Sequence, residues 1–350
     1  MAQNITTNPQ SSNNNALANV SNNALERLIV LTQTDMEKVN SLIISRAHSH
    51  VDMVPELANY LIGSGGKRLR PMLTIACAKM FANPNENESN KSQYFAAAVE
   101  FMHNATLLHD DVVDESNMRR NKPAARIIWG NQASVLVGDF LLGQAFLMMV
   151  ETKDIDALGI LSKAATIIAE GEVFQLSKIK DLNTSAQEYD MVIRSKTGAL
   201  FEAATKVGAM AGGADAASYE ALGIYGLELG RAFQLSDDAL DYGGAKGVFG
   251  KNTGDDLREG KMSLPIILLL ENANDKEKAL IVSALGNQDC DDLIVEKIIG
   301  LMKEKKILEQ VMQQASNSVA NAKKALEILP SGEIVDALFD IADFCLVREY

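Results

Sequence analysis

The sequence FMHNATLLHDDVVDESNMRR, from Phe101 to Arg120, is an apolar run that ends in three aspartates and a pair of arginines. Its apolar residues recur at helical spacing, which predicts an α-helix that ends in Asp110, Asp111 and Asp114. Asp110 and Asp114 stand four residues apart, so both carboxylates project from one helix face. Like charges at this spacing repel each other. A bound divalent cation would make this cluster tolerable.

A second copy of this pattern, FQLSDDALDY at residues 233–242, ends another apolar helical run and supplies Asp237, Asp238 and Asp241. Mg²⁺ prefers oxygen ligands, takes few of them from protein and completes its shell with water and substrate phosphates. One such cluster on its own is more often a solvated acidic helix face. Two copies at helix ends favour a Mg²⁺ site that holds a phosphorylated substrate.

The whole chain has the composition of a soluble globular protein, with 350 residues of which 47% are hydrophobic and 23% charged. Long Ala-, Leu- and Glu-rich stretches at helical spacing, with hardly any alternating strand pattern, predict one all-α domain over residues 23–350, packed as a helical bundle. Residues 1–22 are rich in Asn and Ser and offer little to bury. They predict a disordered N-terminal tail.

Charge, hydropathy and cysteine content exclude several classes of protein. A net charge of −13 argues against a nucleic-acid-binding protein, which needs a basic face. The apolar stretch at residues 135–150 is interrupted by Asp139, so we expect no membrane-spanning helix. Three widely separated cysteines indicate neither a zinc site nor a disulfide framework, and they fit a cytoplasmic location.

Basic residues complement the acidic clusters. Lys67 and Arg70 share one segment, and Arg119 and Arg120 follow the first cluster closely. Arg presents a planar fork of donors to phosphate oxygens, and Lys presents a compact charge. The segment GSGGK at residues 63–67 is not a Walker P-loop, because it lacks the first glycine of that motif and the Ser or Thr after the lysine.

Further polar residues accompany the apolar helices, although each alone is weak evidence. His103 lies seven residues before Asp110, which is two helical turns, and therefore on the same face. The remaining candidates lie next to apolar helical sequence or bracket a polar loop; they are Lys196, Thr197, Gln234, Lys251 and Lys261.

Five motifs, in chain order, resemble those of the trans-polyprenyl diphosphate synthases, most closely the long-chain octaprenyl and decaprenyl enzymes. They are GGKRLRPML at residues 65–73, LLHDDVVDESNMRRNKPA at 107–124, KTGALF at 196–201, FQLSDDALDY at 233–242 and GKNTGDDLREGKMSLP at 250–265. The resemblance covers residues 23–350. It implies the isoprenoid synthase fold, an all-α bundle around a deep central cavity, and a homodimer.

The resemblance also implies roles for the candidate residues. The two aspartate clusters would face each other across the cavity mouth and hold Mg²⁺, three ions per active site, on an allylic diphosphate. Isopentenyl diphosphate would contact Lys67, Arg70, His103 and Arg120. The allylic diphosphate would contact Arg119, Lys196, Thr197, Gln234, Lys251 and Lys261.

The chemistry implied by this family is a head-to-tail condensation. Mg²⁺ and cationic side chains stabilise the departing diphosphate, so the allylic C–O bond ionises. The double bond of isopentenyl diphosphate attacks the resulting cation, and a proton is then lost. The candidates for this catalytic step are Asp110, Asp114, Lys196 and Asp237.

Product length should depend on what lies beneath the first cluster. Thr106 and Ala105, four and five residues before Asp110, place no aromatic ring across the cavity. Family members with bulky residues there typically stop at three or four isoprene units. We therefore expect a product of about eight to ten units, octaprenyl diphosphate above all, built on farnesyl diphosphate and destined for the membrane as a quinone side chain.

Several alternatives stay open at this level. A shorter-chain synthase would make a geranylgeranyl or farnesyl product. His48, His50 and the pair His109–Asp110 loosely match an HD-type metal-dependent phosphohydrolase, but that reading leaves the second cluster and the paired arginines without a role. A non-catalytic subunit of a prenyl synthase would lack the aspartate clusters, and a terpene cyclase would lack the basic residues for isopentenyl diphosphate.

Overall fold

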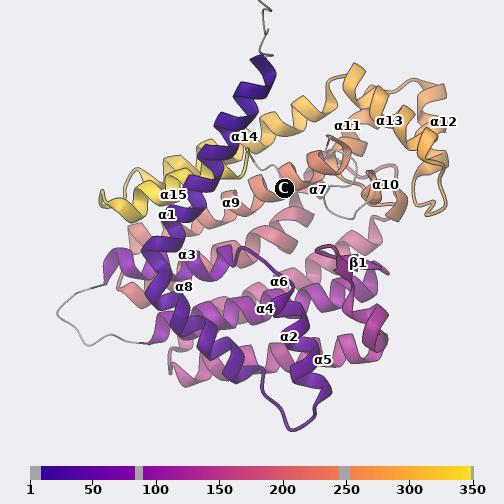
Figure 1. The fold of residues 1–350 in the computed structure, drawn as a ribbon. Helices are drawn as coiled ribbons and strands as arrows, with labels where there is room; N and C mark the ends of the chain where they lie inside the picture. The colour runs from indigo at the N-terminus through magenta and orange to yellow at the C-terminus, as the bar shows by residue number, and fades with distance from the viewer. Residues whose placement is uncertain (1–8, 83–89, 244–252, 348–350) are drawn as a thin grey trace, which may run out of the picture.

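The computed structural model describes residues 9–82, 90–243 and 253–347, with side chains from residue 23 onward (Figure 1). Its α-helices are α1 (Pro9–Arg46), α2 (Met53–Gly63), α3 (Leu69–Phe81), α4 (Lys91–Val113), α5 (Ala125–Glu151), α6 (Ile155–Ser177), α7 (Ala186–Ile193), α8 (Ala199–Gly212), α9 (Ala216–Gly243), α10 (Asp255–Glu259), α11 (Leu264–Asn272), α12 (Asp275–Ala284), α13 (Asp292–Glu304), α14 (Ile307–Leu326) and α15 (Glu333–Phe344). A π-helical turn, η1 (Arg194–Gly198), joins α7 to α8, and the strands β1 (Met118–Arg119) and β2 (Lys122–Pro123) form a short antiparallel hairpin. The predicted all-α fold is confirmed.

Short capping sequences fix where several helices begin. The Ser185 hydroxyl accepts a hydrogen bond from the Glu188 backbone N–H, and the Glu188 carboxylate accepts one from the Ser185 backbone N–H, so α7 begins with a capping box. Asn274 and Glu277 form the same arrangement at α12. Asp154 caps α6 by accepting a backbone N–H. Because α6 and α7 carry side chains of the candidate site, these caps help to set its geometry.

Four helices form a closed ring of neighbours at the centre of the bundle. Helix α5 packs against α4 and α6 on one side, and α8 packs against both on the other. Helix α9 lies between α8 and α14, and Figure 1 shows α14 running along α9. Gly208 of α8 lies so close to the backbone of Thr74 on α3 that a Cβ atom there would overlap the Thr74 carbonyl oxygen. This glycine therefore permits the close packing of α3 against α8.

Two clusters of buried apolar side chains meet along α9. The larger cluster fills the space between α3, α4, α5, α6 and α8, and α9 contributes Leu229 to it. The smaller cluster lies between α7, α11, α13 and α14, and α9 contributes Leu235 and Tyr242. One helix thus joins both cores, as expected for a single domain. The predicted start of this domain at residue 23 stays a prediction.

Helix α1 differs from the expectation for the N-terminus. It begins at Pro9 and so includes residues 9–22, for which the sequence predicts a disordered tail. Proline suits the first turn of a helix, and no glycine or further proline interrupts the chain before residue 23. A helix nucleated by the packed part of α1 can therefore extend backward to Pro9. Residues 1–8 lie outside the described residues.

Helix α5 also differs from expectation. Of the described helices, it alone is long and apolar enough to cross a membrane when judged by length and composition. The sequence predicts no such helix, because Asp139 interrupts the apolar run. In the structure α5 packs along α4 within the bundle, but several apolar side chains on its other side are exposed, among them Leu136 at 66%.

Candidate active site

The first aspartate cluster occupies the end of α4, and the hairpin that follows folds back towards it. Asp111 is 1% exposed, and its Oδ1 accepts hydrogen bonds from Nε and Nη2 of Arg119 at 2.9 and 2.5 Å. Arg120 and Asn121 form the two-residue turn between β1 and β2 with φ angles of 51° and 61°. Positive φ at both positions is typical of a type I′ hairpin turn. The tight hairpin therefore returns Arg119 to the helix it follows.

Basic side chains surround His103 on α4. Burial, together with the positive charges of Arg70, Arg120 and Arg119, lowers the pKa of His103 well below its usual range, so the imidazole is neutral at pH 7. Gly66 has a φ of 157° and lies against the Arg120 guanidinium, where a Cβ atom would be 2.9 Å from Nη1. The structure thus brings together three of the four residues expected to contact isopentenyl diphosphate.

Lys67, the fourth of these residues, and Arg70 each face an aromatic ring. Lys67 Nζ lies 4.5 Å from the ring centroid of Phe344 at the end of α15. Arg70 Cζ lies 4.3 Å from the ring centroid of Phe201 on α8. Both distances are within the range of cation–π attraction. The two rings, one on α15 and one on α8, therefore each hold one cation in a defined position.

Lys196 and Thr197 lie in the π-helical turn η1, a rare geometry that is often found at functional sites. Lys196 Nζ donates hydrogen bonds to Glu172 Oε2 at 2.9 Å and Gln175 Oε1 at 3.1 Å, both on α6. It also lies 3.9 Å from Asp110 Oδ2. Lys196 therefore connects α6 to the first aspartate cluster.

The two outer aspartates of the first cluster differ in how their charge is stabilised. Burial raises the pKa of Asp110 to about 7, and the Glu172 and Asp114 carboxylates add to this effect while Lys196 offsets part of it. Burial also tends to raise the pKa of Asp114. Lys261, which donates a 2.8 Å hydrogen bond to Asp114 Oδ2, opposes this effect, and the pKa of Asp114 lies below its usual value. A further cation beside Asp110 would favour its ionised form.

The middle aspartate of the second cluster, Asp238, accepts hydrogen bonds from two neutral side chains. The Tyr189 hydroxyl donates to Asp238 Oδ2 at 2.6 Å, and Gln234 Nε2 donates to Asp238 Oδ1 at 2.8 Å. The Thr197 hydroxyl donates to Gln234 Oε1 at 2.8 Å, which links η1 to α9. Burial, together with the nearby Asp256 carboxylate, raises the pKa of Asp238 to about 8. The predicted contacts Thr197 and Gln234 thus also orient the second cluster.

The segment before α11 contacts both clusters. Lys261 pairs with Asp114 of the first cluster, and the Asp256 backbone N–H donates to Asp241 Oδ2 of the second at 3.3 Å. Because five residues of chain separate these two contacts, the clusters lie at the same end of the bundle. Lys251, which was also expected to contact the diphosphate, lies outside the described residues.

The side chains at this end suit Mg²⁺, although the described residues include no ready-made group of three His, Cys, Asp or Glu side chains in metal-binding geometry. Mg²⁺ needs only one or two carboxylates when phosphate and water complete its shell. Two buried acceptors, Asp111 Oδ2 and Glu172 Oε1, have no hydrogen-bond partner in the described parts of the chain. Asp110 and Asp114, with the half-buried Asp237 on α9, would hold the ions.

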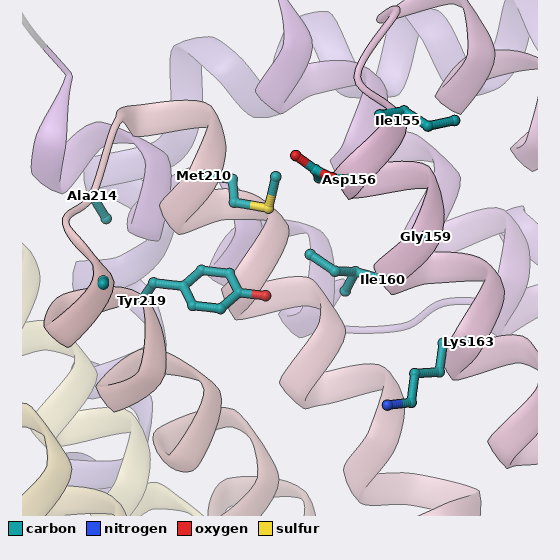
Figure 2. A pocket seen from close by; sticks show the side chains of 9 residues that line it. Ile155, Asp156, Gly159, Ile160, Lys163, Met210, Ala214 and Tyr219 are labelled. Carbon is teal, nitrogen blue, oxygen red and sulfur yellow. The ribbon is translucent and has the colours of Figure 1, made fainter.

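Two cavities differ in their relation to these residues. A cavity of about 90 Å³ lies at the clusters; its lining includes Lys196, Thr197, Gln234, Asp238 and Lys261. A larger one of about 520 Å³ opens between the start of α6 and the turn from α8 to α9 (Figure 2). None of the residues that line the larger cavity belongs to the predicted site. The smaller cavity is therefore the relevant one.

The two residues expected to set product length face different surroundings. Thr106 lies one turn before Asp110 and is half-buried, and its hydroxyl donates to the His103 carbonyl oxygen at 2.9 Å. Ala105 is 1% exposed and belongs to the main apolar core. Since residues four apart share a helix face, Thr106 is the better placed of the two to meet a chain that extends from Asp110.

Sequence reasoning missed four residues of this site: Glu172, Gln175, Tyr189 and Asp256. Tyr189 precedes Lys196 by seven residues, and this two-turn spacing is the signal that relates the two side chains. Glu172 and Gln175 lie three residues apart at the end of an apolar helix, with no acidic repeat to mark them. Asp256 lies within the fifth motif, between the predicted contacts Lys251 and Lys261.

Comparison with known proteins decides the family. Residues 51–302 match the polyprenyl synthetase family. The chain belongs to this family. It is 39% identical over 327 residues to the octaprenyl diphosphate synthase of Haemophilus influenzae, a match that covers 93% of this chain and 98% of that protein.

Solved structures of polyprenyl synthases have the same fold. The polyprenyl synthase of Caulobacter crescentus, complexed with calcium and isoprenyl diphosphate, superposes with a TM-score of 0.88 at 46% identity and covers 93% of this chain and 98% of that one. A decaprenyl diphosphate synthase from Rhodobacter capsulatus gives a TM-score of 0.87 at 44% identity, over 93% and 100% of the two chains. The predicted family and its isoprenoid synthase fold are confirmed.

Proposed function

We propose that this polyprenyl synthetase makes a long-chain all-trans polyprenyl diphosphate by Mg²⁺-dependent condensation of isopentenyl diphosphate onto an allylic diphosphate. The observation that carries the proposal is the joining of the two aspartate clusters at one end of an all-α bundle by Lys261 and Asp256. The calcium and isoprenyl diphosphate in the Caulobacter crescentus structure support a divalent cation beside a prenyl diphosphate.

In this mechanism the first cluster and its lysines receive the allylic diphosphate. Bound Mg²⁺, three ions in our proposal, would supply electrostatic stabilisation of the departing diphosphate. Lys196 and Lys261, which pair with carboxylates in the structure, lie where they can turn their charge to the phosphate oxygens. Arg119, which holds Asp111, adds a further positive charge beside the leaving group.

The second substrate occupies the basic group around His103. Arg70 and Arg120 would bind the diphosphate of isopentenyl diphosphate, and the neutral His103 can donate a hydrogen bond without competing for a proton. The allylic C–O bond ionises, and the double bond of isopentenyl diphosphate then attacks the resulting cation. The proton lost from the new tertiary cation passes to an oxygen of the released diphosphate. Burial of the site excludes water, which would otherwise quench the cation.

We propose octaprenyl diphosphate as the main product, farnesyl diphosphate as the primer and a quinone side chain as the destination. The octaprenyl name of the Haemophilus influenzae relative supports this length, and so does the absence of an aromatic ring at Thr106 and Ala105. The reaction needs only soluble diphosphates until the product leaves for the membrane, which fits a cytoplasmic enzyme.

Replacing Thr106 with Phe tests the control of product length. The ring would project from the face of Asp110 one turn, about 6 Å, below it. We expect the main product to shorten to about three or four isoprene units, as measured by mass spectrometry of the dephosphorylated products, while Thr106→Val keeps the parent length. An unchanged product from Thr106→Phe would contradict this position for the growing chain.

We also propose that the enzyme is a homodimer that pairs through α5. The outward side of this helix exposes large apolar side chains, which single soluble chains seldom group together. They are Ile127, Ile128, Leu136, Leu147 and Val150. Light scattering of the wild type should give the mass of two chains, and Leu136→Asp should give that of one. A monomeric wild type would contradict the proposal.

The decisive experiment for the proposed function incubates the purified protein with Mg²⁺, farnesyl diphosphate and isopentenyl diphosphate and sizes the products. We expect about eight isoprene units in the main product, and no condensation by Asp110→Asn. Products of three or four units would favour the shorter-chain alternative. No condensation by the wild type would refute a synthase.

A further inference from the structure

Tyr189 lies on α7, outside the five motifs, yet its hydroxyl is buried against the second aspartate cluster. Both Tyr189 and Asp238 are 5% exposed, and the oxygen–oxygen distance between them is 2.6 Å. A hydrogen bond of this length to a carboxylate in a dry environment is strong and directional. The contact joins two helices, because Asp238 lies on α9.

Asp238 is the meeting point of three elements. Its Oδ2 accepts the Tyr189 hydroxyl of α7, and its Oδ1 accepts the amide of Gln234 on α9 itself. The Gln234 carbonyl oxygen in turn accepts the hydroxyl of Thr197 in η1, the turn that also carries Lys196. Two hydrogen bonds therefore fix the rotamer of Asp238. The bond from Gln234 lies within α9, and the bond from Tyr189 comes from α7.

We propose that Tyr189 is a positioning residue of the metal site. It holds the last turn of α9 against α7 through Asp238, and so sets the direction from which the second aspartate cluster meets Mg²⁺. The inference rests on the proposed function, because the ion is the one that the two clusters would share. Groups that orient metal-binding carboxylates typically contribute 10–100-fold to metal affinity or activity.

A purely structural role makes a different prediction, and Tyr225 provides the matched control. Tyr225 lies on α9, is completely buried and donates its hydroxyl to the Leu338 carbonyl oxygen on α15 at 2.9 Å. Tyr189→Phe and Tyr225→Phe therefore each remove one buried interhelical hydrogen bond and keep the ring. Only Tyr189 touches the aspartate clusters, so only Tyr189→Phe should change the response to Mg²⁺.

Two measurements on the full-length protein separate these possibilities. The first is the Mg²⁺ concentration that gives half-maximal condensation. The second needs no turnover: it is the rise in melting temperature on adding Mg²⁺ with inorganic diphosphate. For Tyr189→Phe we expect the half-maximal Mg²⁺ concentration to rise at least about 10-fold and the melting-temperature rise to shrink at the same Mg²⁺ concentration. Tyr225→Phe should stay within about twofold of the wild type in both.

A double variant adds a test of the route through Asp238. If Tyr189 acts through this carboxylate, Tyr189→Phe should add little to the change in Mg²⁺ response already caused by Asp238→Asn. A Tyr189→Phe protein with the Mg²⁺ response of the wild type would overturn the inference, even if its melting temperature fell. A wild type that binds Mg²⁺ and diphosphate but makes no prenyl product would instead refute the proposed function and leave the positioning test valid.

Discussion

The middle aspartates of the two clusters, Asp111 and Asp238, occupy equivalent places in their motifs but are stabilised in opposite ways. Both are nearly inaccessible, at 1% and 5% exposure. Asp111 is paired with the charged guanidinium of Arg119, whereas Asp238 is held by the neutral donors Tyr189 and Gln234. Asp111 thus has a charged partner, whereas both side-chain donors to Asp238 are neutral.

This difference extends to the surroundings of the two regions. Lys196 and Lys261 approach the outer aspartates of the first cluster, and arginines surround His103 below it. Another carboxylate, Asp256, lies near Asp238, and burial together with this negative charge raises the pKa of Asp238 to about 8. We conclude that Asp238 depends more strongly on an added cation than Asp111 does.

Removal of the metal is expected to have the largest effect. If Mg²⁺ neutralises the diphosphate between the clusters, its loss removes several kcal/mol of transition-state stabilisation, or about 10³-fold in rate. Initial rates of condensation should fall by this factor in excess EDTA and return when Mg²⁺ exceeds the chelator. A rate that is unchanged by EDTA would show that the lysines and arginines alone neutralise the diphosphate.

Breaking the Asp111–Arg119 pair tests the stability of the first cluster. Arg119→Leu leaves a buried carboxylate without its counter-charge and should lower the free energy of unfolding by about 3 kcal/mol in urea denaturation. Gln234→Leu removes only a neutral donor from Asp238 and should lower it by about 1 kcal/mol. Adding Asp111→Asn to Arg119→Leu should restore much of the lost free energy of unfolding, because the buried charge is then removed as well. Equal decreases in the free energy of unfolding for Arg119→Leu and Gln234→Leu would contradict the contrast between Asp111 and Asp238.

Asp238→Asn should raise the free energy of unfolding when Mg²⁺ is absent, whereas Arg119→Leu and Gln234→Leu lower it. Because the pKa of Asp238 rises from 3.8 to about 8 on folding, its contribution to stability is present below pH 4 and is lost as the pH rises towards 8. The amide cannot ionise, so at pH 7 we expect the variant to be about 1 kcal/mol more stable than the wild type and less active. The stability difference should narrow when urea denaturation is repeated at pH 5. A variant less stable than the wild type at both pH values would contradict the raised pKa of Asp238.

The sequence predicts the features that local patterns determine. Helical periodicity gives the all-α fold, and the i, i+4 spacing of the aspartates places their carboxylates on the faces that the structure shows. The same local reasoning does not give the start of α1, which lies at Pro9, within the residues expected to form a tail. It also misses Tyr189 and Glu172, whose partners lie 49 and 24 residues away along the chain. Only the packing of α6 and α7 around η1 brings these side chains to the site.

The smallest expected effect concerns His103, on the cationic side of the comparison. Burial and the adjacent arginines keep its imidazole neutral in the folded protein, whereas the unfolded chain binds a proton near pH 6.5. The unfolded state therefore binds more protons as the pH falls, and the free energy of unfolding should drop by about 1 kcal/mol between pH 7.5 and 5.5 through this residue alone. His103→Gln should remove that part of the pH dependence in urea denaturation, and His50→Gln, at an exposed histidine, should not. If His103→Gln leaves the slope of the free energy of unfolding against pH unchanged, the positive charge around His103 is already neutralised. The contrast between the two regions would then be confined to Asp111 and Asp238.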